Sequence, residues 1–312
     1  MGNIPFYDGY WYCYANCTAM LLGASGEHIS PFLIEPLTGV GLGAFISGSG
    51  LPFFSGLSGE PDKGISKALE ILGFSFEENA SQNSDNPPFE KLEELVNENS
   101  VILGPLDMSY LVYNPERPTY KGVDHYILAH KIEGNKVFVN DPAGYLNVFI
   151  PFEELQKAWK AEAISYKRGY YRYWTKPKRV RTPSPDKIFK DAISFFKNLY
   201  SESDRLAKRN NRRIDVEAIR EVTKLAKSKQ LTSQQLGFMA GFSLPLGAKR
   251  ALHFSQFFQN HDNGLSRLKF GQSELFGRAH AFANQKDLKN LSITLENIAS
   301  LESDIKREIL NS

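Results

Sequence analysis

Three side chains of the types that perform nucleophilic catalysis lie far apart along this 312-residue chain: Cys13, His125 and Asp141. A cysteine thiolate attacks carbonyl carbon, an imidazole moves the proton, and a carboxylate orients the imidazole. A fold that brought these groups together would support acyl transfer or hydrolysis through a covalent intermediate on sulfur.

Cys13 opens a helix that we predict over residues 13–24, directly after the loop of residues 8–12. The unpaired amide groups and positive dipole end of a helix N-terminus favour a thiolate. Cys17 is one turn further on, before an apolar run, and we interpret it as structural, with a resolving thiol as the lesser alternative. For Cys13 itself, the structural alternative is a small buried hydrophobic residue.

His125 and Asp141 flank a predicted β-hairpin. Residues 125–132 and 136–140 alternate as strands, and Gly134-Asn135 is a tight-turn signal between them. Antiparallel pairing returns the end of the second strand beside the start of the first, so we expect Asp141 to approach His125. Taken singly, each residue has a structural explanation: His125 as a core histidine, and Asp141 as part of an Asp-Pro turn. The combination with Cys13 favours a site.

The surrounding pattern predicts an α+β domain over residues 1–175, a linker over 176–185 and an α-helical domain over 186–312. Helical spacing marks residues 65–72, 89–96 and 152–161, and strands are expected at 100–106, 145–150 and 164–173. Three prolines between Thr175 and Pro185 interrupt the periodicity. Beyond them we expect helices at residues 186–200, 215–229, 233–260, 265–283 and 288–310.

Composition excludes several classes of protein. The chain is 42% hydrophobic and 23% charged, which is typical of a globular protein and not of a disordered one. Its longest uncharged stretch, residues 37–59, is rich in glycine and therefore predicts a loop rather than a membrane span. No basic region followed by an apolar run opens the sequence, so we expect a cytoplasmic protein. Two cysteines form neither a disulfide framework nor a zinc site, and no metal or cofactor is expected.

The charges are divided unevenly. Residues 1–175 carry 12 Lys/Arg against 21 Asp/Glu, a net −9, and residues 176–312 carry 25 against 14, a net +11. Such asymmetry indicates either two halves that dock or a basic half that attracts an acidic partner. The basic runs at 176–181 and 208–213 lack interleaved aromatic residues, so solvated helix ends and linker explain them better than nucleic-acid binding.

The motifs resemble a known family. Residues 13–22, CYANCTAMLL, resemble the cysteine-bearing helix of the papain-like double-glycine leader peptidases, and residues 122–142, GVDHYILAHKIEGNKVFVNDP, are similar to their His-to-Asp hairpin. The butirosin-biosynthesis BtrH N-terminal family is a closer match. Its added likeness lies in GVGLG at 39–43, VILGPLDM at 101–108 and DPAGY at 141–145. The resemblance covers about residues 8–175, and the C-terminal half resembles the helical domain of unknown function that often follows.

This resemblance implies a papain-like domain in which Cys13 is the nucleophile, His125 the general base and acid, and Asp141 its orienting partner. It implies transfer of an acyl group from a thioester, on an acyl carrier protein as donor, to a small amine or peptide acceptor, although some relatives cleave peptides instead. The leader peptidases place an oxyanion-donating Gln six residues before the cysteine, where this chain has Tyr7, followed by Asp8. Loss of one such donor costs about 10²- to 10³-fold in rate, which weighs more against a protease than against transfer from an activated thioester.

Further candidates for the oxyanion or substrate site are Tyr7, Asp8, Asn16 and Asp107, the last of which alternatively caps a turn. Gly41 and Gly43 belong to a glycine-rich loop that lacks the Lys-Ser/Thr of a phosphate loop, and we interpret it as a lid near the thiol in preference to a plain surface loop. The missing Gln also leaves open a different class of function, a catalytically inactive papain-like shell that serves as a binding module.

Overall fold

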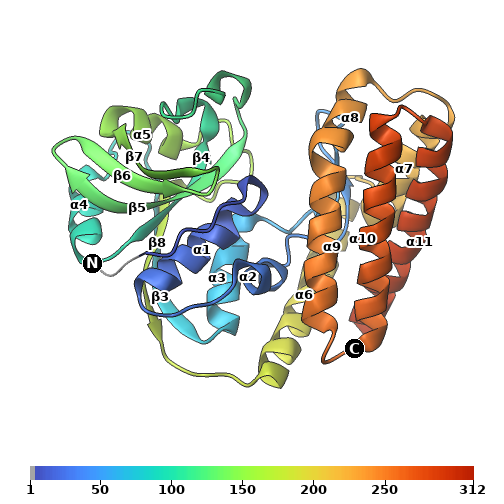
Figure 1. The fold of residues 1–312 in the computed structure, drawn as a ribbon, viewed down its shortest axis with the longest axis horizontal. Helices are drawn as coiled ribbons and strands as arrows, with labels where there is room; N and C mark the ends of the chain where they lie inside the picture. The colour runs from blue at the N-terminus through green and yellow to red at the C-terminus, as the bar shows by residue number, and fades with distance from the viewer. Residues whose placement is uncertain (1–3) are drawn as a thin grey trace. The chain divides into compact units, whose positions relative to one another are not determined.

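The computed structural model describes residues 4–312, and their contacts divide the chain into two compact units. The first extends to Ile34 and resumes at Pro61–Pro183, and the second combines Glu35–Glu60 with Ser184–Ser312. The first unit contains a sheet with helices, and the second is mainly helical (Figure 1). The chain is therefore α+β with a C-terminal helical region, as the order of the sequence patterns predicts.

The first unit is built on a six-stranded sheet in the order β3-β8-β4-β5-β6-β7, with every neighbouring pair antiparallel. The strands are β3 (Phe74–Ser81), β4 (Val101–Asp107), β5 (Asp124–Glu133), β6 (Lys136–Asp141), β7 (Tyr145–Pro151) and β8 (Tyr170–Arg179). The helices of the first unit are η1 (Tyr10–Tyr12), α1 (Cys13–Ala24), α3 (Pro61–Ile71), α4 (Phe89–Glu98), η2 (Met108–Tyr110), η3 (Arg117–Thr119) and α5 (Phe152–Lys160). A further helix, α2 (Pro31–Thr38), spans the point at which the chain passes from the first unit to the second.

The helix α1 is central to this unit, because every residue from Cys13 to Gly23 is buried. A helix that is apolar on all sides is enclosed by other elements. It packs against β5, β4 and β8, and its Tyr14 ring meets the ring of Tyr126 edge-on at 6.1 Å between centroids. The thiol at the start of this helix is therefore held by the sheet.

The other face of the sheet forms the main core of the first unit. Alternate residues of β5, such as Ile127 and Ala129, belong to one cluster with apolar residues of α4 and α5. Tyr126 instead faces α1, as the two-residue period of a strand requires. The α5 helix ends at a left-handed Ala161 and buries Trp159, whose indole nitrogen donates to the Arg172 carbonyl oxygen at 2.7 Å.

The predicted domain boundaries differ from the observed ones in two places. Residues 176–179, expected in the linker, continue strand β8. Thr175 pairs with Glu77 and Lys178 with Ser75, so Lys176 and Pro177 lie at a register shift between the two pairs. A proline is tolerated at such a bulge since no ladder hydrogen bond is required of it. The second difference is that Glu35–Glu60, expected within the first domain, belongs by contacts to the helical unit.

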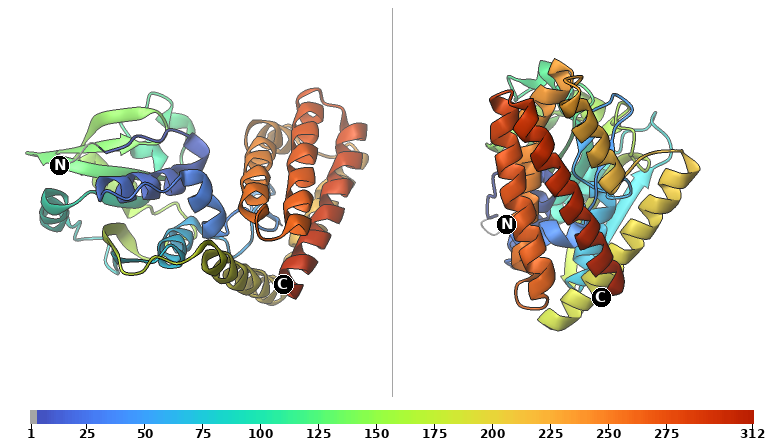
Figure 2. Two further views of the ribbon diagram at one scale, coloured as in Figure 1. Left: turned by 60° about the horizontal axis from the view of Figure 1, so that its bottom comes forward. Right: turned by 90° about the vertical axis from the view of Figure 1, so that its right-hand side faces the viewer.

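The second unit contains the hairpin of β1 (Phe45–Ile46) and β2 (Pro52–Phe53) and a set of long helices. The helices are α6 (Pro185–Arg209), α7 (Asp215–Lys227), α8 (Ser233–Phe238), the π-helical turn η4 (Met239–Ser243), α9 (Leu244–Phe258), α10 (Asn263–Asn284) and α11 (Leu288–Asn311). Helices α9, α10 and α11 lie side by side in Figure 1 and in the left view of Figure 2. The wide turn η4 interrupts the helix expected over residues 233–260. None of the helices within residues 4–312 is both long and apolar enough to cross a membrane.

The glycine loop has a packing role within the helical unit. A Cβ atom at Gly41 would lie 2.9 Å from the Phe254 ring, and one at Gly43 would lie 2.5 Å from the Asp215 carboxylate. Asp215 in turn accepts a hydrogen bond from the Ala44 amide at 3.2 Å. These close approaches of side chains within the helical unit explain why both positions are glycine. The role of the loop as a lid near the thiol stays a prediction.

Candidate active site

The imidazole of His125 and the carboxylate of Asp141 form a buried pair. Nε2 of His125 lies 2.6 Å from Oδ1 of Asp141, and the two side chains are 1% and 0% exposed. His125 is the second residue of β5 and Asp141 the last residue of β6, on the two arms of one hairpin. The contact expected from the hairpin is therefore present, while the catalytic role of both residues stays a prediction.

Asp141 receives two further hydrogen bonds that hold its carboxylate in place. The Ala143 amide donates to Oδ1 at 2.7 Å and the Tyr113 hydroxyl donates to Oδ2 at 2.8 Å. Burial, and then the charge of Asp141, raise the pKa of Tyr113 well above its usual value, so this hydroxyl remains a donor. No sequence pattern points to Tyr113, because it lies in the irregular segment between β4 and β5 with no spacing that relates it to Asp141.

Cys13 meets the other side of the imidazole. Burial by itself lowers the pKa of His125, but the charge of Asp141 and the charge and hydrogen bond of Cys13 outweigh it and raise this pKa well above the usual value. Asp141 lies at Nε2, so Nδ1 is the ring nitrogen through which a proton exchange with the thiol would run. The cysteine side chain is only 6% exposed.

The loop before α1 is tied to the end of β6. The Gly9 amide donates to the Pro142 carbonyl oxygen at 2.8 Å, and Asn16 Nδ2 donates to the Gly9 carbonyl oxygen at 3.0 Å. Gly9 has a φ of 144°, which side chains disfavour, and a Cβ atom there would lie 3.1 Å from Asn16 Nδ2. These bonds set the start of α1, and hence Cys13, beside the residues that follow Asp141.

Cys17 has the environment of a structural residue. It is fully buried one turn along α1. Burial, with smaller contributions from Cys13 and Asp141, raises its pKa well above the usual value. A thiol held in its protonated form is a poor nucleophile, which agrees with the interpretation of Cys17 as structural.

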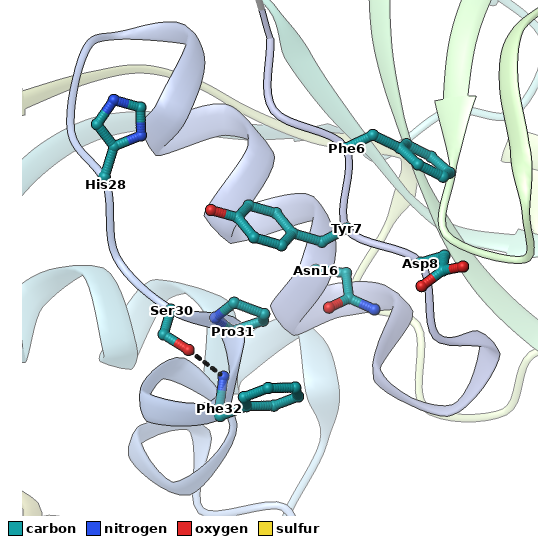
Figure 3. A pocket seen from close by; sticks show the side chains of 8 residues that line it. All are labelled: Phe6, Tyr7, Asp8, Asn16, His28, Ser30, Pro31 and Phe32. Atoms are coloured by element: carbon teal, nitrogen blue, oxygen red, sulfur yellow. Dashed lines mark hydrogen bonds between the residues drawn. The ribbon is translucent and has the colours of Figure 1, made fainter.

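A pocket of about 360 Å³ opens beside α1, and we call it the Asp8 pocket (Figure 3). Its lining residues come from the first loop, from α1, and from the approach to α2 and its first turn: Phe6, Tyr7, Asp8, Asn16, His28, Ser30, Pro31 and Phe32. In Figure 3 the Tyr7 hydroxyl is directed away from Asp8, toward the side of His28. Three of the predicted substrate-site residues, Tyr7, Asp8 and Asn16, are thus brought together.

The remaining candidates lie elsewhere. Asp107, the last residue of β4, accepts hydrogen bonds from the amides of Ser109 and Gly122 at 3.0 and 3.2 Å, so it caps the turn that follows. His130 is half-buried at an irregularity of the β5–β6 pairing, and its Nε2 has no hydrogen-bond partner among the described residues. Within residues 4–312 no group of three or more His, Cys, Asp or Glu side chains is arranged to hold a metal ion.

The fold and site define a class of protein: an α+β unit with a buried cysteine, histidine and aspartate in contact, in a chain that continues into a helical unit. The chain belongs to the YobF family. It is 37% identical over 299 residues to the uncharacterized protein YobF of Bacillus subtilis (strain 168), a match that covers 96% of each chain. Residues 209–310, which span most of the helical unit, match the model of the YobF C-terminal domain.

Proposed function

We propose that this chain is a papain-like cysteine enzyme, related to the BtrH N-terminal family, that transfers an acyl group from a thioester to an amine. The thioester donor would be an acyl carrier protein, and water in place of the amine would give hydrolysis. The observation that carries the proposal is the chain of contacts from Cys13 through the imidazole of His125 to Asp141, with 2.6 Å between Nε2 and Oδ1.

The contacts support specific roles in a first, acylating step. Nδ1 of His125 takes the proton of the Cys13 thiol, and the thiolate attacks the thioester carbonyl carbon. The bond between that carbon and the donor sulfur breaks, and the departing thiolate takes the proton back from His125. Asp141, held by three donors, keeps the ring oriented and stabilises the imidazolium.

The second step transfers the acyl group. A neutral amine attacks the acyl-sulfur carbonyl and gives up a proton to His125, and the carbon–sulfur bond breaks so that Cys13 recovers its proton. A thioester is an activated donor, so this reaction makes a smaller demand on the oxyanion donors than peptide cleavage does. This suits a chain in which Tyr7 replaces the usual Gln and its hydroxyl is directed toward the His28 side of its pocket.

The test uses small acyl thioesters, acetyl- and butyryl-N-acetylcysteamine, with the intact chain. We expect the mass of the protein to rise by one acyl group, with the adduct mapped to Cys13. The Cys13→Ala variant is expected to form no adduct and the Cys17→Ala variant to form it normally. Absence of an adduct in the wild-type chain, or an adduct on other residues alone, would contradict the proposal.

The alternative function is an inactive papain-like binding module, and the 6% exposure of Cys13 favours it, because a thiol so enclosed admits only small reagents. Under this alternative Cys13→Ala would alter ligand binding without any adduct ever forming. The thioester experiment therefore separates the two functions.

A further inference from the structure

The Asp8 pocket contains an acidic side chain without a basic partner. The Asp8 side chain is exposed, and among residues 4–312 no hydrogen-bond donor or cation pairs with its carboxylate. The first 60 residues of the chain include no Lys or Arg, and the first basic residue after them is Lys63. The loop that supplies this pocket therefore offers Asp8 no internal cation.

The same pocket offers a second hydrogen-bond acceptor. Asn16 is 2% exposed, and its Nδ2 is occupied by the Gly9 carbonyl oxygen at 3.0 Å. Its Oδ1 accepts no hydrogen bond from the described residues, and Figure 3 shows this oxygen directed toward the side of Pro31. A ligand that meets both Asp8 and Asn16 must supply donors and gains most if it is positively charged.

Aromatic rings complete the wall of the pocket. The rings of Tyr7 and Phe32 lie on the two sides of Asn16 in Figure 3, and Phe32 is 55% exposed. The face of an aromatic ring attracts an organic cation, whereas it offers nothing to a carboxylate or phosphate. His28 lies at the end of the view opposite Asp8.

We propose that the Asp8 pocket binds an organic ammonium group. The ammonium lies at the Asp8 carboxylate between aromatic rings, and further N–H or O–H groups of the same ligand donate to Oδ1 of Asn16. Asp8 is the residue that selects charge. This inference stands apart from the acyl-transfer proposal, since the pocket needs neither the thiol nor its reaction to bind a cation.

The test measures binding of named probes to the intact chain: 1,4-diaminobutane and choline, their neutral counterpart 1,4-butanediol, and the anion butyrate. The side-chain amide signals of Asn16, followed by NMR, report on this pocket. We expect both cations to bind with dissociation constants in about the millimolar range, as suits ligands of so few atoms. The diol and butyrate are expected to cause no saturable shift.

Asp8→Asn is expected to weaken binding of the cations about tenfold, as loss of a hydrogen bond to a charged group does. Asp85→Asn is the matched control, since Asp85 is an exposed aspartate in another loop of the same unit. Cys13→Ala is expected to bind both cations as the wild type does, so that failure of the enzyme proposal and failure of this one are distinguishable. Equal binding by Asp8→Asn, equal binding of the diol, or no shift with any cation would overturn the inference.

Discussion

Oδ1 of Asp141 lies 2.6 Å from Nε2 of His125, and Cys13 interacts with the same imidazole. One strand hairpin fixes the first two groups, and a single buried helix brings the third. Each of the three side chains can therefore be replaced separately to test its effect on the other two.

Asp141→Asn is expected to lower the pKa of His125. The carboxylate charge is a main cause that raises this pKa, and burial, which lowers it, remains in the variant. An NMR titration of the His125 ring in both chains measures the change. Asp107→Asn serves as control, because that carboxylate contacts Ser109 and Gly122 instead. An unchanged pKa in Asp141→Asn would show that the pair does not exist in solution.

The same substitution is expected to change how stability depends on pH. Folding raises the pKa of His125, so the protonated imidazole stabilises the folded state. This contribution to the free energy of unfolding is complete below the pKa of the unfolded chain, about 6.5, and is lost as the pH rises through the pKa of the folded chain. We therefore compare the free energies of unfolding of the wild type and Asp141→Asn at two pH values. The advantage of the wild type is expected to be larger near pH 6 than near pH 9, by at least about 1 kcal/mol. Urea unfolding at the two pH values measures this, and a difference that grows with pH contradicts it.

Tyr113→Phe is expected to destabilise the first unit by about 1–2 kcal/mol, since Oδ2 of Asp141 loses a charge-assisted hydrogen bond inside the protein. The reactivity of Cys13 is expected to fall with it. Tyr145→Phe is the matched control, because its hydroxyl donates at 3.2 Å to the neutral amide oxygen of Asn114. Equal effects of the two substitutions on Cys13 would remove Tyr113 from the site.

Gly9→Ala is expected to slow reactions of Cys13. The added methyl group enters a backbone conformation that costs about 1–3 kcal/mol and lies 3.1 Å from Asn16 Nδ2, which ties the loop to α1. Gly26→Ala is the control, because Gly26 also has a positive φ, of 83°, but its Cβ would meet nothing within 4 Å. Comparable loss of Cys13 reactivity in both variants would attribute the effect to general instability.

Much of the fold follows from patterns that are local in sequence. The helix over Cys13–Ala24, the hairpin on Gly134-Asn135 and the long C-terminal helices depend on spacing, turn residues and capping, all of which the sequence displays. The approach of Asp141 to His125 also follows, because the register of a hairpin is set by its turn.

The parts that could not be predicted depend on contacts between distant segments. Strand β3 is missed because its alternation is weak, and it is stabilised by pairing with β8 about a hundred residues later. Gly41 and Gly43 look like a mobile loop until Phe254 and Asp215 are placed against them. The hydrogen bond from Tyr113 to Asp141 depends on the path of an irregular segment, which no spacing rule predicts.

In the proposed mechanism His125 activates the sulfur of Cys13, and the rate at which iodoacetamide alkylates Cys13, measured against pH, reports this activation. We expect Cys13 in the wild type to react faster near neutral pH than an ordinary exposed thiol, and His125→Ala to remove this advantage while Cys17→Ala keeps it. A Cys13 that reacts no faster than the same residue in the unfolded chain, with a pH profile unchanged by His125→Ala, would show that the imidazole does not activate the thiol.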